Sequence, residues 1–133
     1  MTSDADRLDA ADERSRADEA LRAARALLQS GLFADAVSRA YSGAYHYLRA
    51  LLRTRGLEPR SHAGALHLLN VEFIRPGALP SGVNRLLAGL QRSRELADYD
   101  PSIRFDATDA SALLDDAERF AAIIRPLLPD APA

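Results

Sequence analysis

Arg94, Asp98 and Tyr99 form the set of side chains in this sequence that most strongly suggests chemistry. Arg94 falls on the apolar stripe of a predicted helix, in line with Val83, Leu87 and Leu90. Asp98 follows four residues later, where a carboxylate can pair with a guanidinium, and Tyr99 adds a hydroxyl group. Such a cluster either lines a cleft with a binding or formerly catalytic role, or holds the helix end in place as a structural ion pair.

A second candidate is the polar face of the helix predicted over residues 34–55. On the side opposite its apolar stripe, this helix carries Arg39, Ser42, His46, Arg49 and Arg53. Three guanidinium groups and an imidazole on one face can hold a phosphate backbone. The alternative is an ordinary solvated face, in which His46 is a surface or interhelical histidine.

Several other site chemistries lack the residues that they need. The sequence has no Gly-rich phosphate loop and no serine-nucleophile elbow, and the absence of cysteine excludes a disulfide, a thiolate metal site and a cysteine nucleophile. His62 and His67 are five residues apart, which separates them by about 140° around a helix, so they do not converge on a metal. We therefore expect neither a metal nor a cofactor.

Charge is distributed unevenly along the chain. Residues 1–21 carry a net charge of −4, residues 22–94 a net charge of +8, and residues 95–133 a net charge of −6. All 17 basic residues are arginine, whose planar guanidinium suits phosphate and carboxylate groups. The middle of the chain therefore either presents a basic surface to an anion or is neutralised by the acidic ends folding back on it.

Hydrophobic periodicity predicts an all-α protein, an antiparallel four-helix up-and-down bundle with one additional short helix. The helices are expected over residues 9–29, 34–55, 62–73 and 81–98, with a fifth that Thr108 caps and Pro126 ends. The helix over 34–55 has a second face of small residues and one tyrosine, formed by Ala36, Ala40, Gly43, Tyr47 and Ala50. A helix with two such faces is predicted to lie at the centre of the bundle.

The length of 133 residues predicts a single domain over residues 1–133, with residues 1–8 and 128–133 frayed. No apolar run reaches the length of a membrane span, and the N-terminus is acidic where a secretory signal would be basic. We expect a cytoplasmic protein with no membrane partner.

Over residues 20–127 the sequence resembles the HEPN domain, and within it the small stand-alone proteins often encoded beside a minimal nucleotidyltransferase. The resemblance rests on Ser38-Arg39-Ala40-Tyr41 with Ala44 and His46, Gly56-Leu57, Ser61-His62 with Gly64, Phe73, Gly77 with Leu79-Pro80, and Arg94 with Ala97-Asp98-Tyr99. It implies a helical bundle that forms a homodimer through the face bearing Arg94. It also implies a role in a toxin–antitoxin-like module, with a nucleotidyltransferase partner or a nucleotide or RNA ligand.

Catalytic HEPN ribonucleases carry an arginine and a histidine with four to six residues between them. In this sequence the positions at which that histidine would stand after Arg94 hold Tyr99, Asp100 and Pro101. A tyrosine, with an ordinary pKa near 10, does not replace imidazole as a general base at neutral pH. We therefore expect weak or no intrinsic ribonuclease activity.

Related modules also suggest that Tyr99 accepts a nucleotide from the partner nucleotidyltransferase, with Arg94 in reach of the added phosphate. Asp98 and Asp100 oppose this, because like charges repel the added group. Two alternatives to the module component stay open. One is a non-catalytic helical dimerisation or adaptor protein. The other is an atypical metal-independent ribonuclease that combines Arg94 with His46 or His62.

Overall fold

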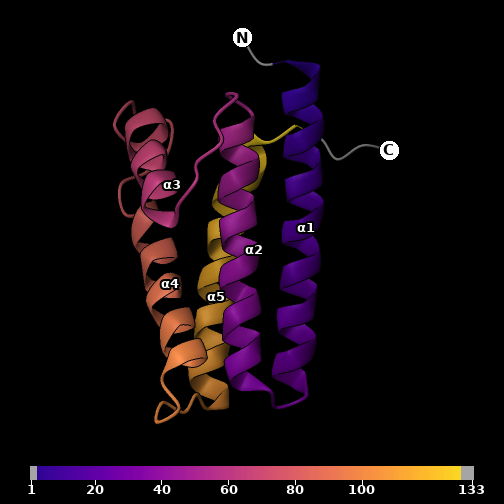
Figure 1. Ribbon diagram of the computed structural model, residues 1–133, viewed down its shortest axis with the longest axis vertical. Coiled ribbons are helices and arrows are strands. Elements are labelled where there is room, and N and C mark those ends of the chain that lie inside the picture. The colour runs from indigo at the N-terminus through magenta and orange to yellow at the C-terminus, as the bar shows by residue number, and fades with distance from the viewer. Residues whose placement is uncertain (1–2, 130–133) are drawn as a thin grey trace.

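The computed structural model describes residues 3–129, and these residues form helices and loops with no strand. Residues 3–129 contain four long helices, one short helix and two further single turns, and Figure 1 shows how the helices are arranged. The elements are α1 (Asp4–Gln29), α2 (Phe33–Arg53), α3 (His62–Leu69), the π-helical turn η1 (Asn70–Ile74), α4 (Val83–Tyr99), α5 (Ala107–Ile124) and the 3₁₀ turn η2 (Arg125–Leu127). The predicted all-α class is confirmed.

The long helices run alternately up and down, and α2 lies at the centre of the bundle (Figure 1). It packs against α1, α4, α5 and α3, whereas α4 and α5 also pack against each other. Eleven of its 21 residues are buried, on two faces, which confirms the central position predicted from its small residues. The short α3 lies above α4 at the edge of the bundle in the view of Figure 1.

One apolar core joins the long helices. Leu48 of α2, Leu87 of α4 and Leu114 of α5 all belong to it, as their helical periodicity predicts. The side of α1 that faces the core supplies mainly alanine, with Leu21 as its one large buried side chain. Alanine lets α1 approach α2 closely, because it adds little volume between the two backbones.

Capping groups shift three helix starts from their predicted positions. The first helix begins at Asp4 and not at residue 9, because Ser3 and Asp6 form a reciprocal capping box. Asp106, with Asp109, caps α5 in the same way, so Thr108 lies inside the helix and the predicted cap was wrong. The start of α4 follows Gly82, whose φ of 98° is a left-handed conformation that glycine adopts without strain.

Of the two ends predicted to be frayed, the structure describes residues 3–8 and 128–129. Residues 4–8 are helical, and Leu128 is buried against the core. Residues 1–2 and 130–133 lie outside the described residues. The third predicted helix is also divided, because the α-helical part ends at Leu69 and the π-helical turn continues to Ile74.

Gly43 marks the closest approach of α1 and α2. A Cβ atom built on Gly43 would lie 2.6 Å from Cδ2 of Leu21, 2.7 Å from its Cγ, and 3.3 Å from the backbone oxygen of Ala17. Side chains larger than hydrogen therefore push the two helices apart or displace Leu21 from the core.

We expect Gly43→Ala to lower the free energy of unfolding by about 1 kcal/mol, because overpacking exceeds the gain in helix propensity. The matched control is Gly89→Ala in α4, where no atom of residues 3–129 beyond the local helix lies within 4 Å of the added Cβ. This control should raise stability by about 1 kcal/mol. Urea unfolding of both variants measures the difference, and equal stabilisation by the two would show that the helices are not in tight contact at Gly43.

Candidate functional site

A groove of about 510 Å³ lies where α2, the start of α3 and α4 meet. Three segments line it: α2, the residues that lead into α3, and the second half of α4. Their lining side chains are Ser38, Arg39, Tyr41, Ser42, Tyr45, Arg60, Ser61, His62, Gln91, Arg94 and Asp98. The groove thus combines arginines with aromatic rings from elements far apart in the sequence.

Arg94 is held in this groove by contacts from two helices. Its Nε lies 3.2 Å from Oδ2 of Asp98, the i+4 partner predicted from the sequence. The hydroxyl of Ser38 in α2 donates to Oδ1 of the same aspartate at 2.7 Å. The guanidinium carbon of Arg94 lies 5.3 Å from the ring centre of Tyr41, within cation–π range. Arg94 is therefore oriented by its neighbours and remains partly exposed to the groove.

His62 is positioned by a cap and by a tyrosine. Ser61 caps α3 by accepting from the backbone nitrogen of Gly64 at 2.9 Å, which fixes His62 as the first residue of the helix. Its Nδ1 and the Tyr41 hydroxyl share a hydrogen bond of 2.8 Å. This pair joins α3 to α2 beside Arg94.

Burial favours the uncharged form of both partners of this pair. Burial lowers the pKa of His62, against a smaller opposing effect of Glu95. Burial, followed by the effect of Tyr45, raises the pKa of Tyr41 to about 12. The groove therefore contains a neutral imidazole and a neutral phenol beside a permanent cation.

Two predicted site residues lie elsewhere. His46 donates from Nδ1 to Oε2 of Glu13 in α1 at 2.6 Å, on a different side of α2. Tyr99 lies outside the groove and is 76% exposed, whereas Tyr41 is only 7% exposed. The side chain of Tyr99 is therefore far more accessible to solvent than that of Tyr41. The structure therefore brings together Arg94, Asp98, His62 and Arg39, but neither His46 nor Tyr99.

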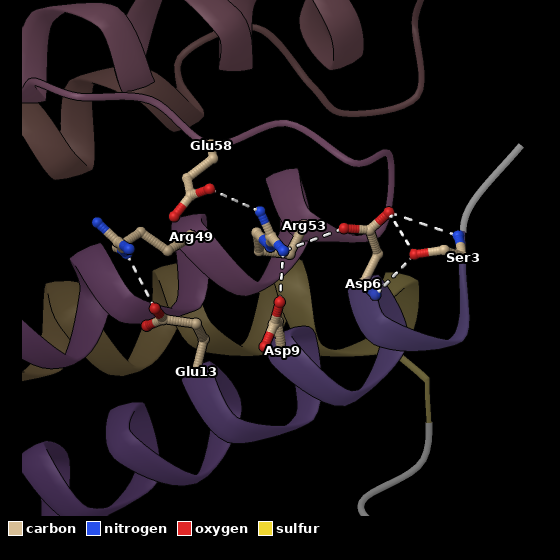
Figure 2. A network of polar contacts seen from close by, with 7 residues as sticks. All are labelled: Ser3, Asp6, Asp9, Glu13, Arg49, Arg53 and Glu58. Atoms are coloured by element: carbon tan, nitrogen blue, oxygen red, sulfur yellow. Dashed lines mark hydrogen bonds and ion pairs between the residues drawn. The ribbon is translucent and has the colours of Figure 1, made fainter.

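Carboxylates of α1 contact the C-terminal part of the basic face predicted on α2, as Figure 2 shows for Arg49 and Arg53. Arg53, whose side chain is only 15% exposed, pairs with Asp6 at 3.0 Å, with Asp9, and with Glu58 at 3.1 Å. Arg49 donates from Nε to Oε1 of Glu13 at 3.0 Å. The N-terminal acids thus fold back and neutralise this part of the chain, one of the two outcomes anticipated from the charge pattern.

A second cavity, of about 410 Å³, lies between α1 and α5 and also contains arginines. There Arg25 pairs with Glu118, and Arg125 lies 3.9 Å from Asp18. Carboxylates thus face two of the three arginines of this cavity, whereas Arg39 and Arg60 of the groove have no carboxylate partner among residues 3–129, so the groove is the better candidate for an anion.

Sequence reasoning missed part of the groove. Helical periodicity places Tyr41 on the apolar stripe of α2, although its hydroxyl contacts His62 at the groove wall. Tyr45 follows it at i+4, and the two rings stack with centres 5.7 Å apart. That spacing places both tyrosines on one helix face and was the available signal. No pattern in the sequence predicts that Arg60 lines the groove, because the position of this residue depends on the path of the loop before α3.

Residues 3–129 contain neither a metal site nor a membrane span. In that part of the chain, no group of three or more His, Asp or Glu side chains is placed to hold a metal ion. None of its helices combines the length and the apolar character that a membrane span requires.

Comparison with known proteins identifies the family. The HEPN domain model matches residues 10–127, and the chain belongs to the HEPN domain family, as the sequence resemblance predicted. A protein named "Putative toxin MJ0605" from Methanocaldococcus jannaschii is 33% identical over 104 residues, which cover 78% of this chain and 77% of that protein. The "UPF0332 protein glr0978" from Gloeobacter violaceus is 34% identical over 106 residues, or 79% of this chain and 84% of that protein.

A solved structure supports the fold. The crystal structure of TT1696 from Thermus thermophilus superposes with a TM-score of 0.76 at 24% sequence identity. The superposition covers 90% of this chain and 98% of that chain. The bundle and its order of helices are therefore shared by this structure.

The contact between Glu13 and its two basic partners gives a prediction for stability. Burial alone would raise the pKa of Glu13, but hydrogen bonds from His46 and Arg49 outweigh it, so the pKa lies below the ordinary value of 4.5. We expect Glu13→Gln to lower the free energy of unfolding by about 2 kcal/mol at neutral pH. The ionised carboxylate stabilises the fold fully above pH 4.5, and this contribution is lost as the pH falls through the lowered native pKa.

Urea unfolding of wild type and Glu13→Gln at neutral and at strongly acidic pH measures this difference. The control is Asp116→Asn, which removes the exposed pair with Arg119 and should change stability by less than about 0.5 kcal/mol. A Glu13→Gln effect that stays constant over the whole pH range would contradict the assignment.

Proposed function

We propose that this protein is the HEPN-domain component of a toxin–antitoxin-like module and that it binds a nucleotide or RNA in the groove at Arg94. The observation that carries the proposal is that two arginines of the groove have no carboxylate partner within the described chain. Among residues 3–129, no carboxylate pairs with Arg39 or Arg60, whereas α1 acids occupy Arg49 and Arg53. Cations without partners around a groove attract phosphate groups.

The similarity to a protein named a putative toxin supports the module part of this proposal. We also propose the two partners that the family resemblance implies, a second copy of the chain and a minimal nucleotidyltransferase. In support, Leu96 and Tyr99 are exposed on a face of α4 that points away from Arg94, and exposed apolar side chains that lie together are typical of contact surfaces. We also propose nucleotide transfer to Tyr99, in support of which its side chain is exposed.

Binding is tested with fluorescently labelled single-stranded RNA and fluorescence anisotropy. We expect Arg94→Ala to weaken binding about tenfold, because a charge-assisted hydrogen bond to phosphate is lost, and to reduce the salt dependence of affinity. The control is Arg119→Ala on the exposed face of α5, which should bind like wild type. No detectable binding, or equal binding by the two variants, would favour the adaptor protein.

One observation favours a second function, an atypical ribonuclease. When Nδ1–H of His62 donates to the Tyr41 oxygen, Nε2 carries the lone pair that a general base needs. His62 would then take the proton from a ribose 2′-hydroxyl, whose oxygen attacks the adjacent phosphorus as the bond to the 5′-oxygen breaks. Water protonates the leaving oxygen, and Arg94 offsets charge on the phosphate.

We expect wild-type protein in the presence of a chelator to cleave RNA no faster than a buffer control, because the family motif lacks its histidine after Arg94. Gel electrophoresis of incubated RNA measures this. Cleavage that both Arg94→Ala and His62→Ala abolish, but His46→Ala retains, would establish the ribonuclease instead. His46→Ala is the matched control because its imidazole pairs with Glu13 away from the groove.

A further inference from the structure

The groove contains an aromatic wall that phosphate binding does not require. Tyr45 stacks on Tyr41 with ring planes 20° apart, and it stacks on His62 with planes 27° apart and centres 5.9 Å apart. Tyr41 and His62 are themselves in ring contact at 5.7 Å. Three rings from two helices thus form one cluster beside the arginines.

The members of this cluster differ in exposure. Tyr41 is buried, whereas Tyr45 and His62 are partly exposed and line the groove. Burying all three rings would be favourable for stability alone, since aromatic side chains contribute large apolar areas. Partly exposed rings at the wall of a groove instead provide a flat surface on which another flat group can stack.

We propose that the groove binds an unpaired nucleobase, which stacks on Tyr45 beside His62 while the attached phosphate lies among Arg39, Arg60 and Arg94. This inference rests on the proposed function, which requires only the phosphate. Stacking on aromatic side chains is a common mode of single-strand recognition, because every base has a flat face. Bases within a duplex are already stacked on their neighbours, so the ligand is single-stranded RNA or a free nucleotide.

Gln91 of α4 supports a ligand that donates hydrogen bonds. Its Nε2 donates to Oε1 of Glu95 at 2.7 Å, but its own Oε1 is buried in the groove wall with no hydrogen-bond partner among residues 3–129. An unpaired buried acceptor is unfavourable. A ligand group that satisfies this oxygen must be a donor, and a base offers N–H donors whereas an ionised phosphodiester offers only acceptors.

The experiment compares two labelled probes with the same number of phosphates, a single-stranded oligoadenylate and its abasic counterpart. We expect wild-type protein to bind the abasic chain about tenfold more weakly. Tyr45→Leu should bind the oligoadenylate about tenfold more weakly, whereas the matched Tyr45→Phe, which keeps the ring, should retain wild-type affinity. Unlabelled duplex RNA should compete poorly, and adenosine monophosphate as competitor distinguishes a free nucleotide from a longer chain.

The outcomes separate this inference from the proposed function. Equal affinity for the two probes, together with a loss on Arg94→Ala, would overturn base stacking and leave phosphate binding in place. Unchanged binding by Tyr45→Leu, with an unaltered thermal unfolding midpoint, would have the same meaning. No binding of either probe would overturn both proposals. If Tyr45→Leu does not fold, the comparison of the two probes still tests base stacking, because it uses only wild-type protein.

Discussion

The burial of α2 on two faces is the constraint on which the rest of the structure depends. On one side α1 approaches so closely that a Cβ at Gly43 would overlap Leu21. On the other side Leu48 and its neighbours join α4 and α5 in the core. With these faces occupied, only the narrow polar edges of α2 remain for other contacts. Every charged or aromatic group at these edges must therefore be paired, stacked or exposed.

The two polar edges of α2 differ because different elements lie beside them. Beside α1, Arg49 and Arg53 meet carboxylates from the N-terminal turns, and the guanidinium groups serve to dock that helix. Beside α3 and α4, Arg39 meets no carboxylate of the described chain. The same residue type therefore has a structural role at one edge and is available to a ligand at the other. Which role an arginine takes depends on whether the element beside it supplies a carboxylate.

Within the groove, a chain of contacts joins three elements. Ser38 and Asp98 orient Arg94, Arg94 lies over Tyr41, and Tyr41 holds His62. Because burial favours the neutral phenol and the neutral imidazole, the permanent cation in this series of contacts is Arg94, which pairs with Asp98. The arrangement presents a cation and flat aromatic surfaces side by side, which are the two features of the proposed nucleotide or RNA site.

The amino-acid sequence by itself determined the helices, the central place of α2 and the pairing of Arg94 with Asp98. These follow from local periodicity and from i to i+4 spacing, both of which a single helix fixes. The tertiary structure decided which arginines are free, since Glu13 and Arg49 are distant in the sequence and meet only when α1 packs on α2. It also decided that His62, and not His46, joins Arg94. The loop after α2 brings α3 to the Tyr41 face, and no local pattern in the sequence encodes that path.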